Sequence, residues 1–368
     1  MKKILITNFY LLNYTGSELV ALQIAKYFAN QNCSVTLAGF DVGSKYLDKK
    51  IENLTVTHIQ NIKNLTYDLI WSCHWPTLTA LLKNNVKACK IVHCSLSPYE
   101  GLERLPRYAN LLSLVTFNSF ETSEIRTKQT KTAQTAIIPN PADEDYFTFN
   151  YTPSKKLKKI AFISNHKFNN YEETIKAFKN KNITLSFYGI VYGNYIEISP
   201  HILSNYDLII TIGRTVQSCF AMGLPVYNYG RFGGMGYMNK DNFFLNAKYN
   251  FSGRTEYINY KSLDKHITDR IDINKILPDI IDKYDCNYSQ LPYLKLQAKK
   301  MFSLKSNMIR TINKLEDSPD INTVEILDTL NFKLDSLSLR FCLAKMRIVQ
   351  KLRKLKKSIL VFIRDSFF

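Results

Sequence analysis

The first forty residues alternate between strand-like and helix-like patterns. Residues 3–40 read KILITNFYLLNYTGSELVALQIAKYFANQNCSVTLAGF, in which two apolar runs flank a longer stretch with apolar residues at helical spacing. The face of that stretch expected to turn inward carries Leu19, Leu22, Ile24, Ala25 and Phe28. Strand, helix and strand in this order favour a parallel, doubly wound sheet.

The same alternation continues along most of the chain. Further apolar runs lie at 68–74 (DLIWSCH), 90–95 (KIVHCS) and 114–119 (LVTFNS). A polar, basic stretch, NYTPSKKLKK, then interrupts the pattern, which restarts at KIAFIS and runs to PVYNYG. We predict an α/β fold with two facing, doubly wound Rossmann-like domains, residues 1–152 and 153–300, and a helical extension over 301–368.

The charge of the chain indicates an anionic partner. It has 368 residues with 49 Lys and Arg against 31 Asp and Glu, a net charge of +18. Such an excess fits nucleic acid, an anionic membrane surface or phosphorylated substrates. No recognised nucleic-acid motif is present and the charge gathers near the C-terminus, so we do not expect a nucleic-acid partner.

The C-terminal stretch 340–364, RFCLAKMRIVQKLRKLKKSILVFIR, mixes basic and apolar residues. One interpretation is a helix that packs on the domains through Ile348, Leu352, Leu355 and Ile359. The other, which we favour, is a basic amphipathic segment that lies on an anionic membrane. SILVFIRDSFF favours it, because these bulky apolar residues have no evident core to cover them.

Other features favour a cytoplasmic protein that is peripheral at the inner face of the membrane. Asn8 and Asn13 interrupt the first apolar run, so we expect a buried strand there rather than a signal peptide. No apolar stretch reaches the roughly 18 residues that span a bilayer. The seven cysteines are scattered, which is typical of reduced thiols.

An anion site is predicted where the apolar run DLIITI meets a helical pattern. Gly213, Arg214 and Thr215 stand at this point. The first turn of a helix has unpaired N–H groups and a partial positive charge, so it suits a phosphate. Arg214 can add a charge-assisted fork to the same anion.

Two more loops at strand ends have the same character. Gly16 and Ser17 precede the first helix, although the single glycine excludes the three-glycine fingerprint of dinucleotide enzymes. Asn165, His166 and Lys167 follow the strand KIAFIS, where Lys167 is well placed to reach a diphosphate. Three such loops point to one phosphate-bearing ligand more strongly than any of them does alone.

These segments, in this order, resemble the GT-B glycosyltransferases of the family 4 type over roughly residues 1–300. The opening stretch resembles that family's first strand, glycine loop, helix and second strand. The other similar segments are DLIWSCH, KIVHCS, FNSFETSE, IIPNPADEDYF and SCFAMGLPVYNYG. IPNPADEDYF together with AMGLPV is the most specific part of the resemblance.

The resemblance implies transfer of a sugar from a nucleotide-sugar donor, usually with retention of configuration and without a metal or other cofactor. Lys167 would meet the diphosphate, the turn at 213–215 would face a phosphate, and Gly16 would approach from the first domain. His93 matches the histidine that lines the reaction centre, and His74 is its rival. Lys167, Arg214 and the helix-end amides would stabilise the departing diphosphate.

One departure from the family concerns its pair of glutamates. The second position is Ser218, preceded by Gln217, and no glutamate lies between Glu197 and Glu256. Gln217 can make neutral hydrogen bonds to the donor instead, but its amide supplies no negative charge, so either donor recognition differs or activity is lost. We interpret the stretch GRFGGMGY, with backbone amides at Gly233 and Gly234 and a charge at Arg231, as a substitute device for holding the donor.

The sequence therefore predicts a glycosyltransferase that acts on a glycan or lipid-linked acceptor, in synthesis of lipopolysaccharide, capsule or a related surface polysaccharide. Two alternatives remain. One is a non-catalytic subunit that binds a nucleotide or glycan and assembles with a partner transferase, as the missing glutamates suggest. The other is a sugar-nucleotide epimerase on the same fold.

Overall fold

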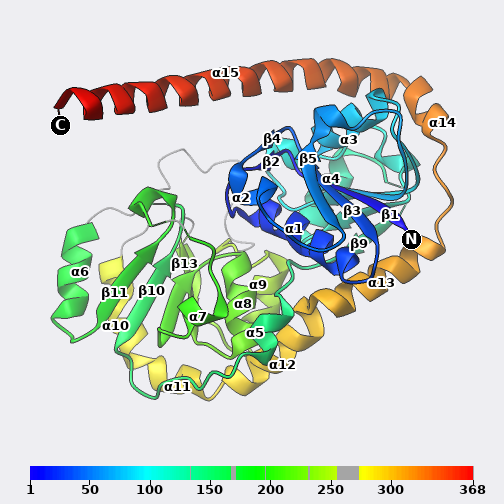
Figure 1. Ribbon diagram of the computed structural model, residues 1–368. Coiled ribbons are helices and arrows are strands. Elements are labelled where there is room, and N and C mark those ends of the chain that lie inside the picture. Colours follow the sequence, from blue (N-terminus) through cyan, green and yellow to red (C-terminus); the bar gives the residue numbers. More distant parts are fainter. Residues whose placement is uncertain (133, 167–170, 195, 231–232, 255–272, 368) are drawn as a thin grey trace.

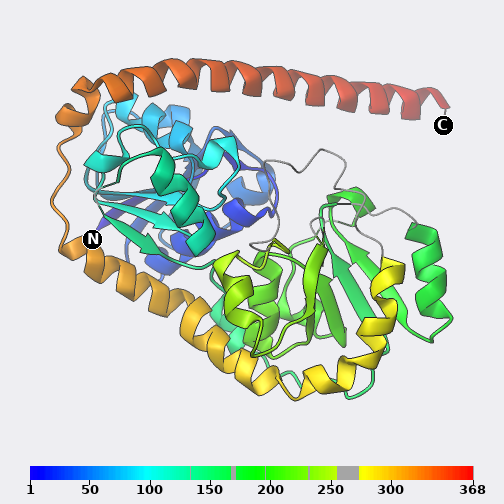
Figure 2. The same ribbon diagram turned by 180° about the vertical axis from the view of Figure 1, so that it is seen from behind.

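The computed structural model describes the whole chain except residues 133, 167–170, 195, 231–232, 255–272 and 368. The chain forms two α/β domains, each built on a mainly parallel sheet with helices on both sides (Figures 1 and 2). The predicted α/β class and the two doubly wound domains are confirmed.

The first domain holds a parallel sheet of seven strands in the order β5-β3-β1-β6-β7-β8-β9. These strands are β1 (Lys3–Thr7), β3 (Ser34–Gly39), β5 (Leu54–His58), β6 (Thr66–Ser72), β7 (Lys87–Ser95), β8 (Leu114–Phe117) and β9 (Thr135–Ile137). A small pair, β2 (Tyr10–Leu11) and β4 (Asp41–Val42), lies beyond the sheet. The α-helices between these strands are α1 (Gly16–Ala29), α2 (Ser44–Leu47), α3 (Trp75–Lys83) and α4 (Phe120–Gln129).

The strand order of the first sheet reverses between β1 and β6. Helix α1 follows β1 on one side and α3 follows β6 on the other, and each side has its own buried apolar cluster. Ligands of open α/β sheets bind beyond the carboxyl ends of the strands at such a reversal. The Gly16 loop after β1 and His74 after β6 are therefore at the expected edge.

The second domain holds five strands in the order β11-β10-β12-β13-β14, of which the last is antiparallel. They are β10 (Lys159–Ile163), β11 (Thr184–Tyr188), β12 (Leu208–Thr211), β13 (Val226–Gly230) and β14 (Gly233–Tyr237). Its α-helices are α5 (Glu144–Thr148), α6 (Tyr171–Lys179), α7 (Pro200–Leu203), α8 (Arg214–Met222), α9 (Phe243–Lys248), α10 (Ile273–Asp282), α11 (Tyr284–Tyr288) and α12 (Leu291–Phe302). Here the order reverses between β10 and β12.

The boundary between the domains lies earlier than the predicted 152/153. Ala142 and Tyr146 are buried in the core of the second domain, and the amide of Ala142 donates to the carbonyl of Phe302 (2.9 Å). Because α5 packs on α8, the second domain begins near 142. The chain crosses between domains there and again after α12.

The segment 301–368 is not a separate extension, because most of it packs on the first domain. Helix α13 (Leu304–Glu316) buries Met308 and Leu315 beside α1. After α14 (Thr323–Asp328), the long α15 (Leu330–Phe367) lies on α3, where Phe332, Leu339 and Met346 are buried.

A buried carboxylate anchors the start of α15. Asp335 is fully buried, pairs with Arg104 (2.7 Å) and Arg107, and accepts from the amide of Arg107 (2.7 Å). Farther along, α15 runs past the first domain (Figures 1 and 2). Ile348 and Leu352 are each 59% exposed, so the interpretation that α15 packs through them is wrong. The side chains of Leu355 and Ile359 lie outside the described residues.

Candidate active site

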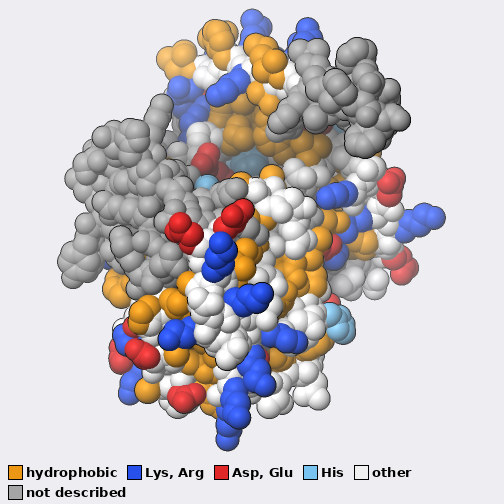
Figure 3. Space-filling view, turned by 90° about the vertical axis from the view of Figure 1, so that its left-hand side faces the viewer, with side chains coloured by type: hydrophobic (Ala, Val, Ile, Leu, Met, Phe, Trp, Pro, Cys, Tyr) orange, Lys and Arg blue, Asp and Glu red, His pale blue; other side chains and the backbone are white. Residues whose placement is uncertain are grey.

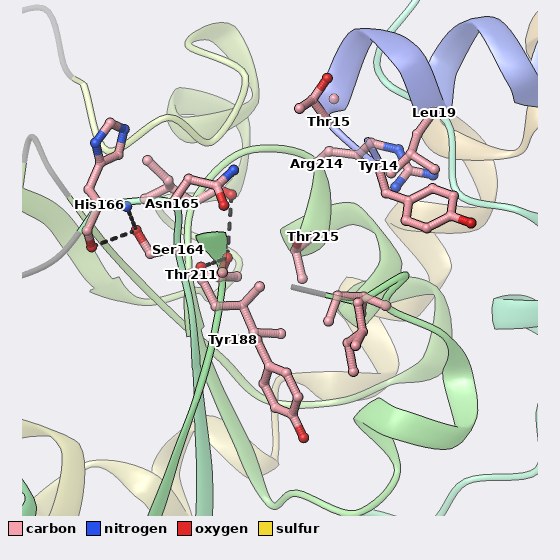
Figure 4. Close-up of a pocket in the computed structure, with 16 residues that line it drawn as sticks. Tyr14, Thr15, Leu19, Ser164, Asn165, His166, Tyr188, Thr211, Arg214 and Thr215 are labelled. Atoms are coloured by element: carbon pink, nitrogen blue, oxygen red, sulfur yellow. Dashed lines mark hydrogen bonds between the residues drawn. The ribbon is translucent and has the colours of Figure 1, made fainter. Parts of the chain in front are cut away.

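A cavity of about 270 Å³ lies between the domains, at the carboxyl ends of the strands of both sheets. Figure 3 shows the molecule hollowed between the two domains, and Figure 4 shows the residues that line the cavity. The first domain contributes the loop at 14–16 and Leu19. The second contributes the ends of β10, β11 and β12 and the start of α8. No Asp or Glu is among the described residues that line it.

A buried glutamate fixes the loop that carries Gly16. The Glu18 carboxylate accepts hydrogen bonds from the amides of Leu12, Asn13 and Thr15, each at 3.0 Å. Burial raises the pKa of this carboxyl, and these hydrogen bonds oppose that effect. The pattern Thr15-x-x-Glu18 is a capping box, a signal that the sequence alone carries.

The first domain therefore offers an open backbone turn to the cavity. Gly16 lines the cavity, and no atom lies within 4 Å of the position that a Cβ would take there. Ser17 does not line it, and its hydroxyl lies 3.5 Å from the amide nitrogen of Asn8. Leu19, expected to face the core, instead lines the cavity.

The start of α8 forms the opposite wall. Gly213 has φ 68° and its N–H donates to the carbonyl of Phe251 (2.7 Å), so this amide is engaged within the protein. Arg214 and Thr215 line the cavity as the first residues of the helix. Their position offers a ligand the partial positive charge of the helix N-terminus.

The guanidinium group of Arg214 has a nitrogen that makes no hydrogen bond with a described residue. Figure 4 shows its side chain extending toward Tyr14 and Thr15. Its Nε is buried and has no hydrogen-bond partner in the part of the chain that the structure describes. A buried guanidinium nitrogen without a partner is costly unless an acceptor fills the site, so this geometry suits an anion.

Gln217, predicted to bind the donor and next to Ser218 at the predicted position of the second glutamate, does not line the cavity. It is 1% exposed, and with its nitrogen turned toward them its amide lies 2.7 Å from the carbonyls of Gly213 and Arg214. The other side of the amide lies 3.3 Å from the side chain of Asn250. Gln217 therefore braces the first turn of α8 against the loop at 250.

The loop after β10 completes the cavity on the side away from Arg214. Asn165 and His166 both line it, and the Asn165 side-chain oxygen accepts from the amide of Ile190 (3.2 Å). The amide of His166 donates to the hydroxyl of Ser164 (3.1 Å). Lys167 lies outside the described residues, so its predicted contact with the diphosphate stays a prediction.

The two candidate histidines differ sharply, and neither lines the cavity. His74 Nδ1 accepts from the amide of Phe9 (2.9 Å), so the proton sits on Nε2 and is donated to Glu103 (3.1 Å). His93, at the end of β7, is fully buried, and neither ring nitrogen makes a hydrogen bond of normal geometry with a described residue. Burial and the neighbouring His74 lower the pKa of His93 to about 3, which keeps it neutral. Its catalytic role stays a prediction.

Within the stretch GRFGGMGY, Gly230 ends β13 and Gly233–Tyr237 forms β14, while residues 231–232 lie outside the described residues. Gly233 and Gly234 begin β14, and a Cβ on Gly234 would come within 1.9 Å of the carbonyl oxygen of Asn228. Strand contact thus explains Gly234, and neither glycine lines the cavity, while Arg231 is not described. Among the described residues, no group of three or more His, Cys, Asp and Glu could hold a metal ion.

An ion pair between the domains was not predicted from the sequence. Arg254 donates two hydrogen bonds to the carboxylate of Glu121 in α4. Its Nε donates to Oε1 (3.0 Å) and a terminal nitrogen donates to Oε2 (2.6 Å). Their side chains are 11% and 6% exposed. Burial and the neighbouring Glu121 raise the pKa of Tyr99, beside this pair, to about 12. The pair is 133 residues apart in sequence, so no local pattern reveals it.

Comparison with known proteins identifies the fold. No protein-family model and no curated protein sequence match the chain. Solved structures do match over most of its length. TarM from S. aureus, in complex with fondaparinux, alpha-GlcNAc-glycerol and UDP, has a TM-score of 0.55 at 9% identity, covering 86% of this chain and 100% of TarM. The chain has the GT-B glycosyltransferase fold.

Two other solved structures agree with this GT-B assignment. Sucrose-phosphate synthase from Thermosynechococcus elongatus matches with a TM-score of 0.50 at 10% identity, over 85% of this chain and 98% of that one. An alpha-glucosyltransferase in complex with UDP and a 13-mer DNA matches with a TM-score of 0.50 at 10% identity, over 86% and 100%. At these identities the likeness establishes the GT-B fold, and assignment to family 4 stays a prediction.

Proposed function

We propose that this GT-B chain is a glycosyltransferase that takes its sugar from a nucleotide-sugar donor bound in the cavity between the domains. The single observation that carries the proposal is Arg214, whose buried, unpartnered Nε stands at the start of α8 in a cavity without acidic lining among the described residues. The fold supports it, because TarM and the alpha-glucosyltransferase were solved with UDP.

In this proposal the donor diphosphate lies between the start of α8 and the turn at Gly16. As the bond from the sugar to the diphosphate breaks, negative charge grows on the leaving diphosphate. Arg214 and the amides of the first turn of α8 stabilise that charge more than the ground state, which lowers the barrier. Because no described residue that lines the cavity is an evident covalent nucleophile, we propose a front-face displacement with retention of configuration, without a metal.

The missing glutamate shapes how the donor would be held. With Gln217 turned toward the backbone of α8, the sugar and ribose meet neutral polar groups such as Asn165 and Thr215. Neutral hydrogen bonds are weaker than those to a carboxylate. The donor affinity therefore depends more on the diphosphate contacts than it would with a glutamate present.

We further propose that α15 brings the protein to the cytoplasmic face of an anionic membrane, where the acceptor is a lipid-linked or surface glycan such as lipopolysaccharide or capsule. Phe341, Ile348 and Leu352 are 79%, 59% and 59% exposed. They alternate with basic residues such as Arg347 and Lys351, a composition that suits an interfacial helix. No described helix is long and apolar enough to cross a membrane.

A thermal-shift screen against UDP, GDP, CMP and ADP and their common sugar conjugates tests the donor proposal. A ligand that binds the native state raises the unfolding temperature in proportion to RT ln(1 + [L]/Kd). We expect a shift with one nucleotide that is lost in Arg214→Ala and kept in Arg310→Ala, a matched surface control in α13. No shift with any nucleotide would contradict the proposal.

The second candidate is a non-catalytic subunit that binds a nucleotide or glycan, and the absence of the glutamate favours it. It predicts the same thermal shift without release of free nucleotide or transfer of sugar, whereas an epimerase would convert the donor itself. Incubation with the donor selected in the screen, followed by analysis of its products, separates these functions.

The expectation of no nucleic-acid partner rests on the sequence alone, since one GT-B structure contains DNA.

A further inference from the structure

A second cavity, of about 170 Å³, lies between the two domains and shares no lining residue with the first. The first domain contributes Ser119 and Phe120, at the start of α4. The second contributes Phe244 and Lys248 of α9 and Phe302 at the end of α12. The cavity therefore lies beside the second crossing of the chain, and none of the proposed donor contacts uses it.

Two exposed aromatic rings border this cavity. Phe120 is 51% exposed and Phe244 is 56% exposed, which is unusual for phenylalanine. The Phe244 ring packs edge-on against the fully buried Phe243, with centroids 5.2 Å apart. Exposed aromatic surface beside a cavity indicates a binding site. Such rings can cover the apolar face of a sugar.

A cation stands beside the same rings. The Lys248 ammonium lies 5.6 Å from the centre of the Phe120 ring and 5.5 Å from that of Tyr249. These cation–π contacts hold a flexible side chain at the edge of the cavity. Helix α4 begins at Phe120 behind its cap Ser119, so its partial positive end faces the same space. No acidic residue is among the described residues that line this cavity.

We propose that this cavity is a saccharide subsite for one acidic sugar residue, whose ring packs against Phe120 and Phe244 while its carboxylate or phosphate faces Lys248. The volume suits a single ring, and the charge selects an anionic substituent. The inference rests on the proposed function in that the sugar belongs to the acceptor glycan. Because both domains line the subsite, its occupant also bridges them.

Calorimetric titration of the full-length protein tests this subsite. The probes are trigalacturonate, the neutral galactotriose and glucose 6-phosphate, and UDP, GDP, CMP and ADP are titrated in parallel. We expect trigalacturonate to bind at least tenfold more tightly than galactotriose, while glucose 6-phosphate tells a phosphate from a carboxylate preference. Lys248→Gln should weaken acidic-sugar binding about tenfold, the size of one charged contact. Phe120→Ala should weaken it by a similar factor because the ring no longer packs against the sugar. Both variants should leave nucleotide binding unchanged.

Matched controls keep the test decisive. Phe341→Ala removes another exposed phenylalanine and Lys128→Gln removes another lysine, in the last turn of α4, and neither should alter sugar binding. Unchanged melting temperatures show that the variants are folded. Absence of acidic-sugar binding, equal binding of the neutral sugar, or unaltered binding in both variants would overturn the subsite. Acidic-sugar binding without binding of UDP, GDP, CMP or ADP would instead overturn the donor proposal and leave the subsite standing.

Discussion

The two turns that face each other across the first cavity, at Gly16 and Gly213, are held in different ways. The turn at Gly16 is fixed locally, because Glu18 accepts hydrogen bonds from backbone amides within the same loop. The turn at Gly213 is fixed from a distance, by the carbonyl of Phe251 and by Gln217 against Asn250. A similar strand-to-helix pattern can thus rest on neighbours in sequence or on contacts that only folding creates.

Among the substitutions in these turns, Glu18→Ala should cause the largest loss of stability. The variant leaves the amides of Leu12, Asn13 and Thr15 without their acceptor, so we expect the free energy of unfolding to fall by about 3 kcal/mol. Urea denaturation measures this, with Glu173→Ala, an exposed glutamate in the first turn of α6, as a control. A loss below about 0.5 kcal/mol, the usual size of a surface substitution, would show that the loop is held by something else.

Gly213→Ala should have the next largest effect. Its φ of 68° and ψ of −138° are strained for any residue with a Cβ, which costs about 2 kcal/mol. Gly101→Ala is the matched control, because that site is also open but has no positive φ. Equal denaturation midpoints for the two variants would contradict a strained turn at Gly213.

His93, at the end of a strand, should make the stability of the protein depend on pH. His93 has a pKa of about 3 when folded, below its usual 6.5, so the unfolded chain binds more protons between these values. The contribution of neutral His93 to the free energy of unfolding is therefore complete above pH 6.5. It is lost as the pH falls toward 3, by up to about 1.4 kcal/mol per pH unit.

Denaturation of wild type and His93→Gln at pH 7 and pH 5 measures this term. The wild type should lose more stability than the variant between the two pH values, since glutamine does not titrate. The same pH dependence in both proteins would show that His93 is not the group responsible.

The smallest effect on stability should come from Gly16→Ala. The site has open space for a methyl group and no positive φ, so we expect the free energy of unfolding to stay within about 0.5 kcal/mol of wild type. The methyl group enters the cavity, however, so nucleotide binding should weaken severalfold. Unaltered nucleotide affinity would show that no ligand approaches this backbone.

Much of this architecture could be predicted from the sequence, because local patterns encode it. Alternating apolar runs and helical stretches predicted both domains, and glycines after strands predicted the loops that carry Gly16 and Arg214 at the cavity. The capping box at Thr15–Glu18 was equally readable. These features depend on residues within one turn or one strand of each other.

The contacts that the sequence did not reveal join distant parts of the chain. The domain boundary moved to about 142 because α5 packs on α8, and the amphipathic pattern of α15 did not show that Asp335 meets Arg104. The Glu121–Arg254 pair likewise joins the two domains. His74 and His93 looked alike as strand-end residues, and only their surroundings distinguish them.

The most direct test of the donor site is single-turnover release of nucleoside diphosphate from the donor chosen in the thermal-shift screen. If Arg214 stabilises the departing diphosphate, Arg214→Ala should slow release by about 100-fold or more, while Arg310→Ala keeps the wild-type rate. A wild-type rate in Arg214→Ala would contradict the assignment of this cavity as the site of sugar transfer.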